Sequence, residues 1–117
     1  MVMHSMVLDF LSFIDNHTDD EVARRFNMPK EISEELREIV VDYFGEWRKI
    51  VPADIRDIEK SRENKPIFNV FSMNQPNRYG LDCVLLDASG NETELIFHAE
   101  FFLANEEYKM TYKYIGS

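Results

Sequence analysis

The stretch "LLDASGNETELIFHAEFF", residues 85–102, decides the fold because it predicts two strands joined by a tight turn. Apolar and polar residues alternate on both sides of "DASGN", a pattern typical of an antiparallel hairpin that buries one face. Gly90 suits the left-handed position that closes a three-residue loop with a bulge. Such a turn sets Leu86 opposite Glu92.

The same register places Cys83 opposite Leu95 and gives the hairpin one apolar face. A four-residue turn at 104–107 then leads into another strand, whose alternate residues join that face. We expect the apolar face to lie against helices. Its residues are Leu81, Cys83, Leu85, Leu95, Phe97, Ala99, Phe101, Leu103, Tyr108, Met110, Tyr112 and Tyr114.

The opposite face mixes charged with scattered apolar side chains, Val84 among them, and we expect it to face water. Glu100 lies diagonal to Lys109 and Lys113, so cross-strand ion pairs explain part of the charge. Phe102 is exposed on this face unless something covers it, and so is Ile96. The candidate partner-binding residues are Asp82, Glu94, Ile96, His98, Glu100 and Phe102.

The same alternation extends over residues 66–117 and predicts four antiparallel strands. Residues 1–58 predict about three helices, and 59–65, "EKSRENK", is a charged connector. We therefore expect one α+β domain over residues 1–117, with the helices packed on one face of a four-stranded meander. The expected strands are residues 67–73, 79–86, 92–103 and 108–115.

Two helices are predicted before residue 27. Thr18 and Glu21 form a capping-box pattern that begins a short helix ending near Phe26. The helix before it has apolar residues recurring every three or four positions, which indicates one buried stripe. These residues are Met3, Met6, Val7, Phe10, Leu11 and Ile14.

A third and longest helix is predicted to begin near Pro29 and to end before Pro52. Gly45 falls inside it, so we expect this glycine to let another backbone approach closely. Residues 52–58 predict one more helical turn.

Composition favours a cytoplasmic protein that binds basic partners. With 22 acidic and 13 basic residues, the net charge is −9, which repels nucleic-acid phosphates. The same acidity also suits a surface that only keeps the protein in solution. Cys83 is the single cysteine, and no apolar stretch approaches the roughly 20 residues of a membrane span, so neither secretion nor a membrane is expected.

No motif predicts an enzyme, a cofactor or a metal site. Cys83 and His98 fall on opposite faces and cannot form a nucleophilic pair. The sequence His98-Ala99-Glu100 lacks the cysteines that would complete a zinc deaminase site. His4 and His17 are expected to be ordinary surface residues.

The tail "YGLDCVLLDASGNETELIFHAEFFLANEEYKMTYKYI", preceded by a long amphipathic helix, resembles the closing meander of cystatin-like and NTF2-like domains. The resemblance implies a curved sheet around a helix, with a cone-shaped cavity between them. An apolar ligand in that cavity is an alternative function. The aromatic residues that would line it are Tyr43, Trp47, Tyr112 and Tyr114.

In size and acidity the chain is also similar to toxin-immunity proteins, which cover the basic site of a nuclease with carboxylates. The leading hypothesis is therefore a non-enzymatic protein-binding module, an inhibitor of a basic protein. A homodimeric structural domain is the third alternative.

Overall fold

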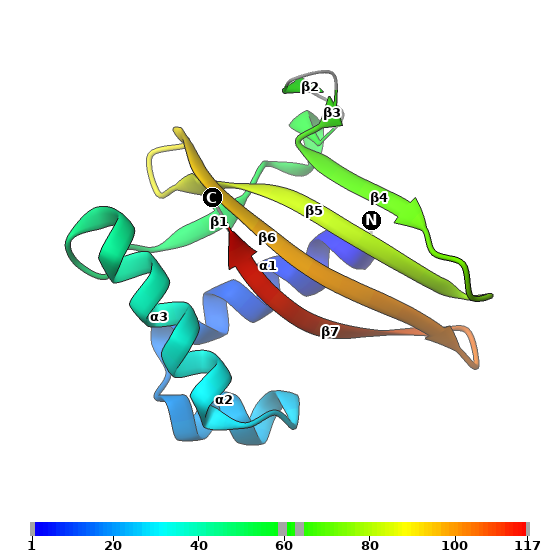
Figure 1. Ribbon diagram of the computed structural model, residues 1–117, viewed down its shortest axis with the longest axis horizontal. Coiled ribbons are helices and arrows are strands. Elements are labelled where there is room, and N and C mark those ends of the chain that lie inside the picture. Colours follow the sequence, from blue (N-terminus) through cyan, green and yellow to red (C-terminus); the bar gives the residue numbers. More distant parts are fainter. Residues whose placement is uncertain (1, 59–60, 63–64, 117) are drawn as a thin grey trace.

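Three helices precede a curled antiparallel sheet in the computed structural model, which describes residues 2–58, 61–62 and 65–116 (Figure 1). This confirms the predicted α+β fold. The helices are α1 (Val2–Asn16), α2 (Asp19–Phe26) and α3 (Lys30–Phe44). The main strands are β1 (Ile50–Pro52), β4 (Phe68–Ser72), β5 (Arg78–Asp87), β6 (Glu92–Ala104) and β7 (Glu107–Gly116).

The strand β5 is central, because β6 pairs with one of its edges while β1 and β4 share the other. β7 pairs with β6 and ends the sheet. Between β1 and β4 lie the short 3-10 helix η1 (Ile55–Asp57) and a two-residue strand pair, β2 (Ser61–Arg62) with β3 (Lys65–Pro66). The predicted connector 59–65 falls partly outside the described residues.

The third helix ends earlier than predicted, and Gly45 is the reason. Its φ of 83° is left-handed, and its N–H donates to the carbonyl of Val41 at 2.7 Å, which terminates the helix at Phe44. A Cβ at Gly45 would meet no atom within 4 Å, so the expected close backbone approach is wrong. The chain then continues into β1, which contains Pro52 and which periodicity did not indicate.

The start of the chain agrees with its sequence pattern. The Thr18 hydroxyl accepts from the backbone N–H of Glu21, and the Glu21 carboxylate accepts from that of Thr18, so the capping box is confirmed. The α1 stripe is also confirmed, since Val7, Phe10 and Ile14 are fully buried between the sheet and the other helices. In Figure 1, α1 crosses behind the sheet, while α2 and α3 lie beside β7.

The turn between β5 and β6 brings Leu86 opposite Glu92 as predicted, but Cys83 pairs with Phe97 instead of Leu95. A bulge in β6 causes the difference. The Thr93 hydroxyl stabilises it by donating to the Leu85 carbonyl at 2.8 Å and accepting from the N–H of Leu95 at 3.0 Å. The pairing shifts by two residues, so the predicted face of Cys83 is unchanged and its side chain is fully buried.

A second irregularity, between β6 and β7, does change a face. Ala99 pairs with Tyr112 but the preceding residue, His98, pairs with Tyr114, so Lys113 is an extra residue in β7. Tyr114 therefore turns away from the core, and its prediction as an inward residue is wrong. Ile115 takes the buried position instead.

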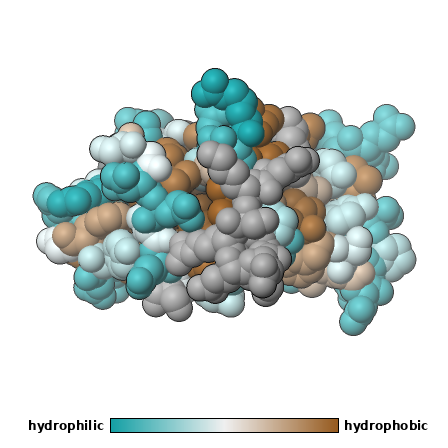
Figure 2. Space-filling model, turned by 90° about the horizontal axis from the view of Figure 1, so that it is seen from above, coloured by the Kyte–Doolittle hydropathy of each residue, from teal (hydrophilic) through white to brown (hydrophobic). Residues whose placement is uncertain are grey.

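The far side of the sheet has a small apolar cluster of its own. Val84 and Ile96, both expected to face water, pack there against the segment that follows β1, so Val84 is buried and Ile96 is partly buried. His4 of α1 is buried too, contrary to expectation, and its Nε2 donates to the carbonyl of Ala53 at 2.6 Å. Figure 2 looks onto the molecule from above, where apolar residues gather in the middle and hydrophilic ones toward both ends.

Candidate protein-binding surface

Beyond this small cluster, the sheet presents side chains to solvent on the face opposite the core. We call this surface the outer face. Strand pairing defines it, because residues directly opposite one another in neighbouring strands point to the same side. By this criterion it consists of Asn69, Phe71, Arg78, Gly80, Asp82, His98, Glu100, Phe102, Lys109, Thr111 and Tyr114. Lys113, the extra residue of β7, joins them through its ion pair with Glu100.

A polar–aromatic group lies at the centre of the outer face. Asp82 and His98 are directly opposite each other, and the Nδ1–H of His98 donates to the Asp82 carboxylate at 2.7 Å. The Tyr114 ring stacks on the imidazole, with 4.2 Å between ring centroids and 21° between ring planes. The break in register at Lys113 brings Tyr114 to the outer face, whereas regular alternation predicts that it faces the core.

Two further pairs order side chains on the same surface. The Glu100 carboxylate lies 3.4 Å from the ammonium of Lys113, one of its two predicted partners. The Arg78 guanidinium lies 4.8 Å from the centre of the Phe102 ring, a cation–π contact. The Glu100 and Lys113 charges are therefore paired with each other, and the Arg78 charge lies against an aromatic ring.

Three aromatic side chains are exposed on the outer face: Phe71 by 43%, Phe102 by 37% and Tyr114 by 54%. Phe102 was expected from the sequence. Phe71 was missed, because the face of β4 depends on its pairing with β5, and the turn between these strands carries no clear register signal. Exposed aromatics gathered on one face are typical of protein-binding surfaces.

The six predicted partner-binding residues are not all in one place. Asp82, His98, Glu100 and Phe102 lie on the exposed part of the outer face. The bulge places Glu94 nearer α3, where its backbone N–H donates to the hydroxyl of Tyr43 at 3.1 Å. Ile96 belongs to the small apolar cluster and is not an exposed anchor.

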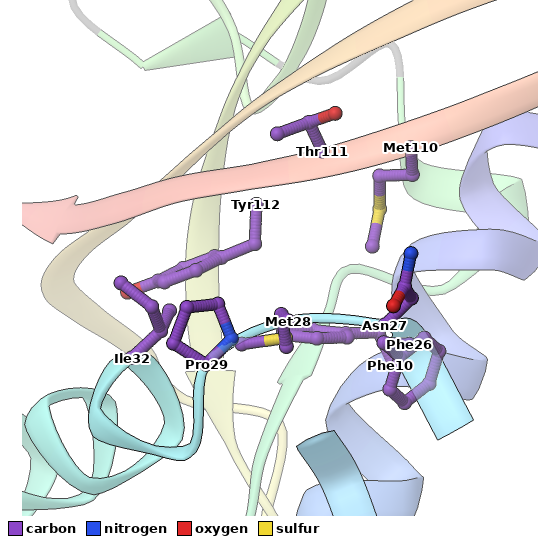
Figure 3. Close-up of a pocket in the computed structure, with 9 residues that line it drawn as sticks. All are labelled: Phe10, Phe26, Asn27, Met28, Pro29, Ile32, Met110, Thr111 and Tyr112. Carbon is purple, nitrogen blue, oxygen red and sulfur yellow. The ribbon is translucent and has the colours of Figure 1, made fainter. Parts of the chain in front are cut away.

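The four residues predicted for a ligand cavity do not line a common space. Tyr112 lines a hollow of about 270 Å³ beside Met28 and Pro29 (Figure 3). Tyr43 lines a different hollow of about 380 Å³. The Trp47 indole N–H donates to Asp15 at 2.9 Å, and Tyr114 lies on the outer face.

The negative charge is concentrated on α3, whose exposed face carries a stripe of carboxylates. They recur at helical spacing, so they lie on one side of the helix. The acidic stripe consists of Glu31, Glu34, Glu35, Glu38 and Asp42. The outer face, by contrast, carries three basic side chains, Arg78, Lys109 and Lys113, and two acidic ones, Asp82 and Glu100.

An ion pair fixes α3 against the other two helices. Asp19 accepts hydrogen bonds from Ser33 and from Nε of Arg37, the latter at 2.7 Å. Arg37 also donates to the carbonyls of Ile14 and His17, at 2.8 and 2.6 Å. Burial by itself would raise the pKa of Asp19, but the hydrogen bonds and the Arg37 charge outweigh it and lower the pKa.

The described residues contain no group of three His, Cys, Asp or Glu side chains arranged to hold a metal ion. Cys83 lies on the core side, away from His98, and burial raises the pKa of its thiol to about 12. In the part of the chain that the structure covers, no helix has the length and apolar character that crossing a membrane requires.

Comparison of the chain with protein-family models, with curated proteins and with solved structures gives no match.

Proposed function

We propose that this protein is a non-enzymatic protein-binding module whose outer face binds a basic protein partner in the cytoplasm. The observation that carries the proposal is the exposure of Phe71, Phe102 and Tyr114 on one face, where Glu100 is paired with Lys113 and Asp82 with His98. Buried aromatic side chains provide much of the affinity in protein interfaces.

The charge of the whole chain suggests the sign of the partner. A net charge of −9 attracts basic proteins and accelerates their association, an effect that salt weakens. Inhibition of a basic enzyme, as immunity-type proteins achieve, is the form of binding that this combination suits best. The single thiol, Cys83, fits a reducing compartment.

The test is capture of partners from the native organism, followed by binding measurements on the purified pair. We expect a basic partner whose affinity falls with salt and falls roughly tenfold or more for Phe102→Ala or Phe71→Ala. Leu8→Ala is the matched control, because Leu8 is exposed by 40% on α1, away from the outer face. If neither phenylalanine substitution changes the affinity for the partner, the outer face is not the binding surface.

A homodimer is the second candidate, since exposed aromatics on a sheet also suit self-association. Sizing of the purified protein separates the two functions. The homodimer is the function if the protein forms a dimer that persists at high salt, that the substitution Phe102→Ala dissociates, and that captures no basic protein. This result would contradict the proposed binding of a basic partner.

A further inference from the structure

Two adjoining hollows form a groove between β7 and the helices. Their volumes are about 610 and 270 Å³, and they share the lining residues Phe26, Asn27, Met110 and Thr111. The larger hollow falls within the range of roughly 300–1,000 Å³ that is typical of small-molecule sites. None of the three exposed aromatic side chains of the outer face lines either hollow. The groove is therefore distinct from the aromatic surface described above.

The smaller hollow is lined mainly by apolar side chains. Figure 3 shows it between β7, which carries Met110 and Tyr112, and the helical side of the molecule. The Phe10 and Tyr112 rings are stacked there, with 5.5 Å between ring centroids. Methionine side chains adapt their shape to what they contact. Two hollows in sequence with such a lining suit a linear aliphatic chain better than a compact ring system. The apolar residues on the helical side are Phe10, Phe26, Met28, Pro29 and Ile32.

The larger hollow carries the charged side chains of the groove, which are Asp9, Arg25 and Lys109. The Arg25 guanidinium lies 3.2 Å from the Asp9 carboxylate and 5.1 Å from the centre of the Phe26 ring, which lines both hollows. Lys109 forms no ion pair within the part of the chain that the structure describes. One positive charge at this end of the groove is therefore left without a partner.

The opposite end of the groove disfavours an anion. Burial, and then the carboxylate of Glu35, raise the pKa of Tyr112, so a negative charge lies near the smaller hollow. The net charge of the chain is −9, but salt screens distant charges over about 8 Å at physiological ionic strength. The nearest side chains therefore decide where a charged group binds, and they favour a negative group only beside Arg25 and Lys109.

We propose that the groove binds a linear aliphatic carboxylate, with its chain between Met28 and Tyr112 and its carboxylate between Arg25 and Lys109. A cationic head group would be repelled by these two side chains, and an uncharged one would leave Lys109 without a partner. The site goes beyond the proposed function and does not depend on it.

The test is calorimetric titration of the full chain with decanoate, at concentrations below those at which it forms micelles. Decylammonium and decanol have the same chain with a cationic and an uncharged head group. We expect decanoate to bind at one site, roughly fivefold more tightly than either of them, because two exposed ion pairs contribute modestly. Amide chemical shifts should change in residues 26–28 and 109–112.

Substitutions at the charged end test the position of the carboxylate. Arg25→Gln and Lys109→Gln should each weaken decanoate binding roughly threefold and leave decanol binding unchanged. Asp9→Asn should strengthen decanoate binding, because it removes the carboxylate that competes for Arg25.

The matched control is Arg48→Gln, which we expect to leave decanoate binding unchanged. Arg48 is paired with Glu46 at 3.2 Å and lies 5.3 Å from the centre of the Phe44 ring, much as Arg25 is held, but it lines neither hollow. The proposal is overturned if decanoate does not bind, if decylammonium or decanol binds as tightly, or if Arg48→Gln weakens binding as much as Arg25→Gln. Shift changes confined to other residues would overturn it as well.

Discussion

The ring of Phe71 lies across Gly80, its neighbour on β5, in the space that a side chain at position 80 would occupy. A glycine in a central strand leaves backbone uncovered, and an aromatic ring from the next strand can shield it. This contact holds Phe71 on the outer face although 43% of its surface is exposed.

Gly80→Ala should therefore displace the Phe71 ring and lower the free energy of unfolding by about 1 kcal/mol or less, the scale of one cross-strand pair. Urea denaturation of Gly80→Ala, Phe71→Ala and the double variant measures the coupling. We expect the alanine at position 80 to cost less when Phe71 is absent. If Gly80→Ala lowers the free energy of unfolding equally in the presence and absence of Phe71, the position of the Phe71 ring does not depend on the glycine.

Gly45→Ala should destabilise the protein by about 1 kcal/mol, because alanine at a φ of 83° is strained. Gly45→Asn should cost less, since asparagine tolerates the left-handed region. Thermal or urea unfolding measures both. The sign of the change in stability for Gly45→Ala distinguishes two positions of the glycine. Alanine would stabilise the protein if Gly45 lay in the interior of a helix, and it destabilises the protein if Gly45 is the left-handed residue that ends the helix.

Asp19→Asn should lower the free energy of unfolding by about 2 kcal/mol at neutral pH, because it weakens charged hydrogen bonds with Ser33 and Arg37. The folded-state pKa of Asp19 lies below its ordinary value of 3.8. The stabilisation is therefore fully present above pH 3.8 and is lost as the pH falls through the folded-state pKa.

Unfolding curves at neutral pH and near pH 3 measure this dependence, with Asp20→Asn as the control for an exposed carboxylate in the same helical turn. We expect the difference between wild type and Asp19→Asn to shrink at the lower pH. A difference that stays constant with pH would exclude the Asp19 charge as its source.

Cys83 should react slowly with a thiol reagent at pH 8, because its side chain is fully buried and burial raises its pKa to about 12. Labelling should accelerate in urea in step with unfolding. Labelling in native buffer as fast as in the unfolded chain would contradict the inward position of β5 residue 83.

Several features were predictable from the sequence because they depend on residues only a few positions apart. The capping box joins Thr18 to Glu21, and the stripe of α1 follows from the helical period. Alternation likewise predicts the four long strands and the buried side of Cys83. Local backbone geometry sets the direction of each side chain, so a short window is sufficient.

Tertiary structure alone decided what lies opposite these side chains. A bulge at Thr93 gives Cys83 a new partner, and the extra residue Lys113 moves Tyr114 to the outer face. The strand β1 and the burial of Ile96 depend on where the chain after α3 returns to the sheet. One inserted residue reverses every later side chain of a strand, and contacts between distant segments determine where it is inserted.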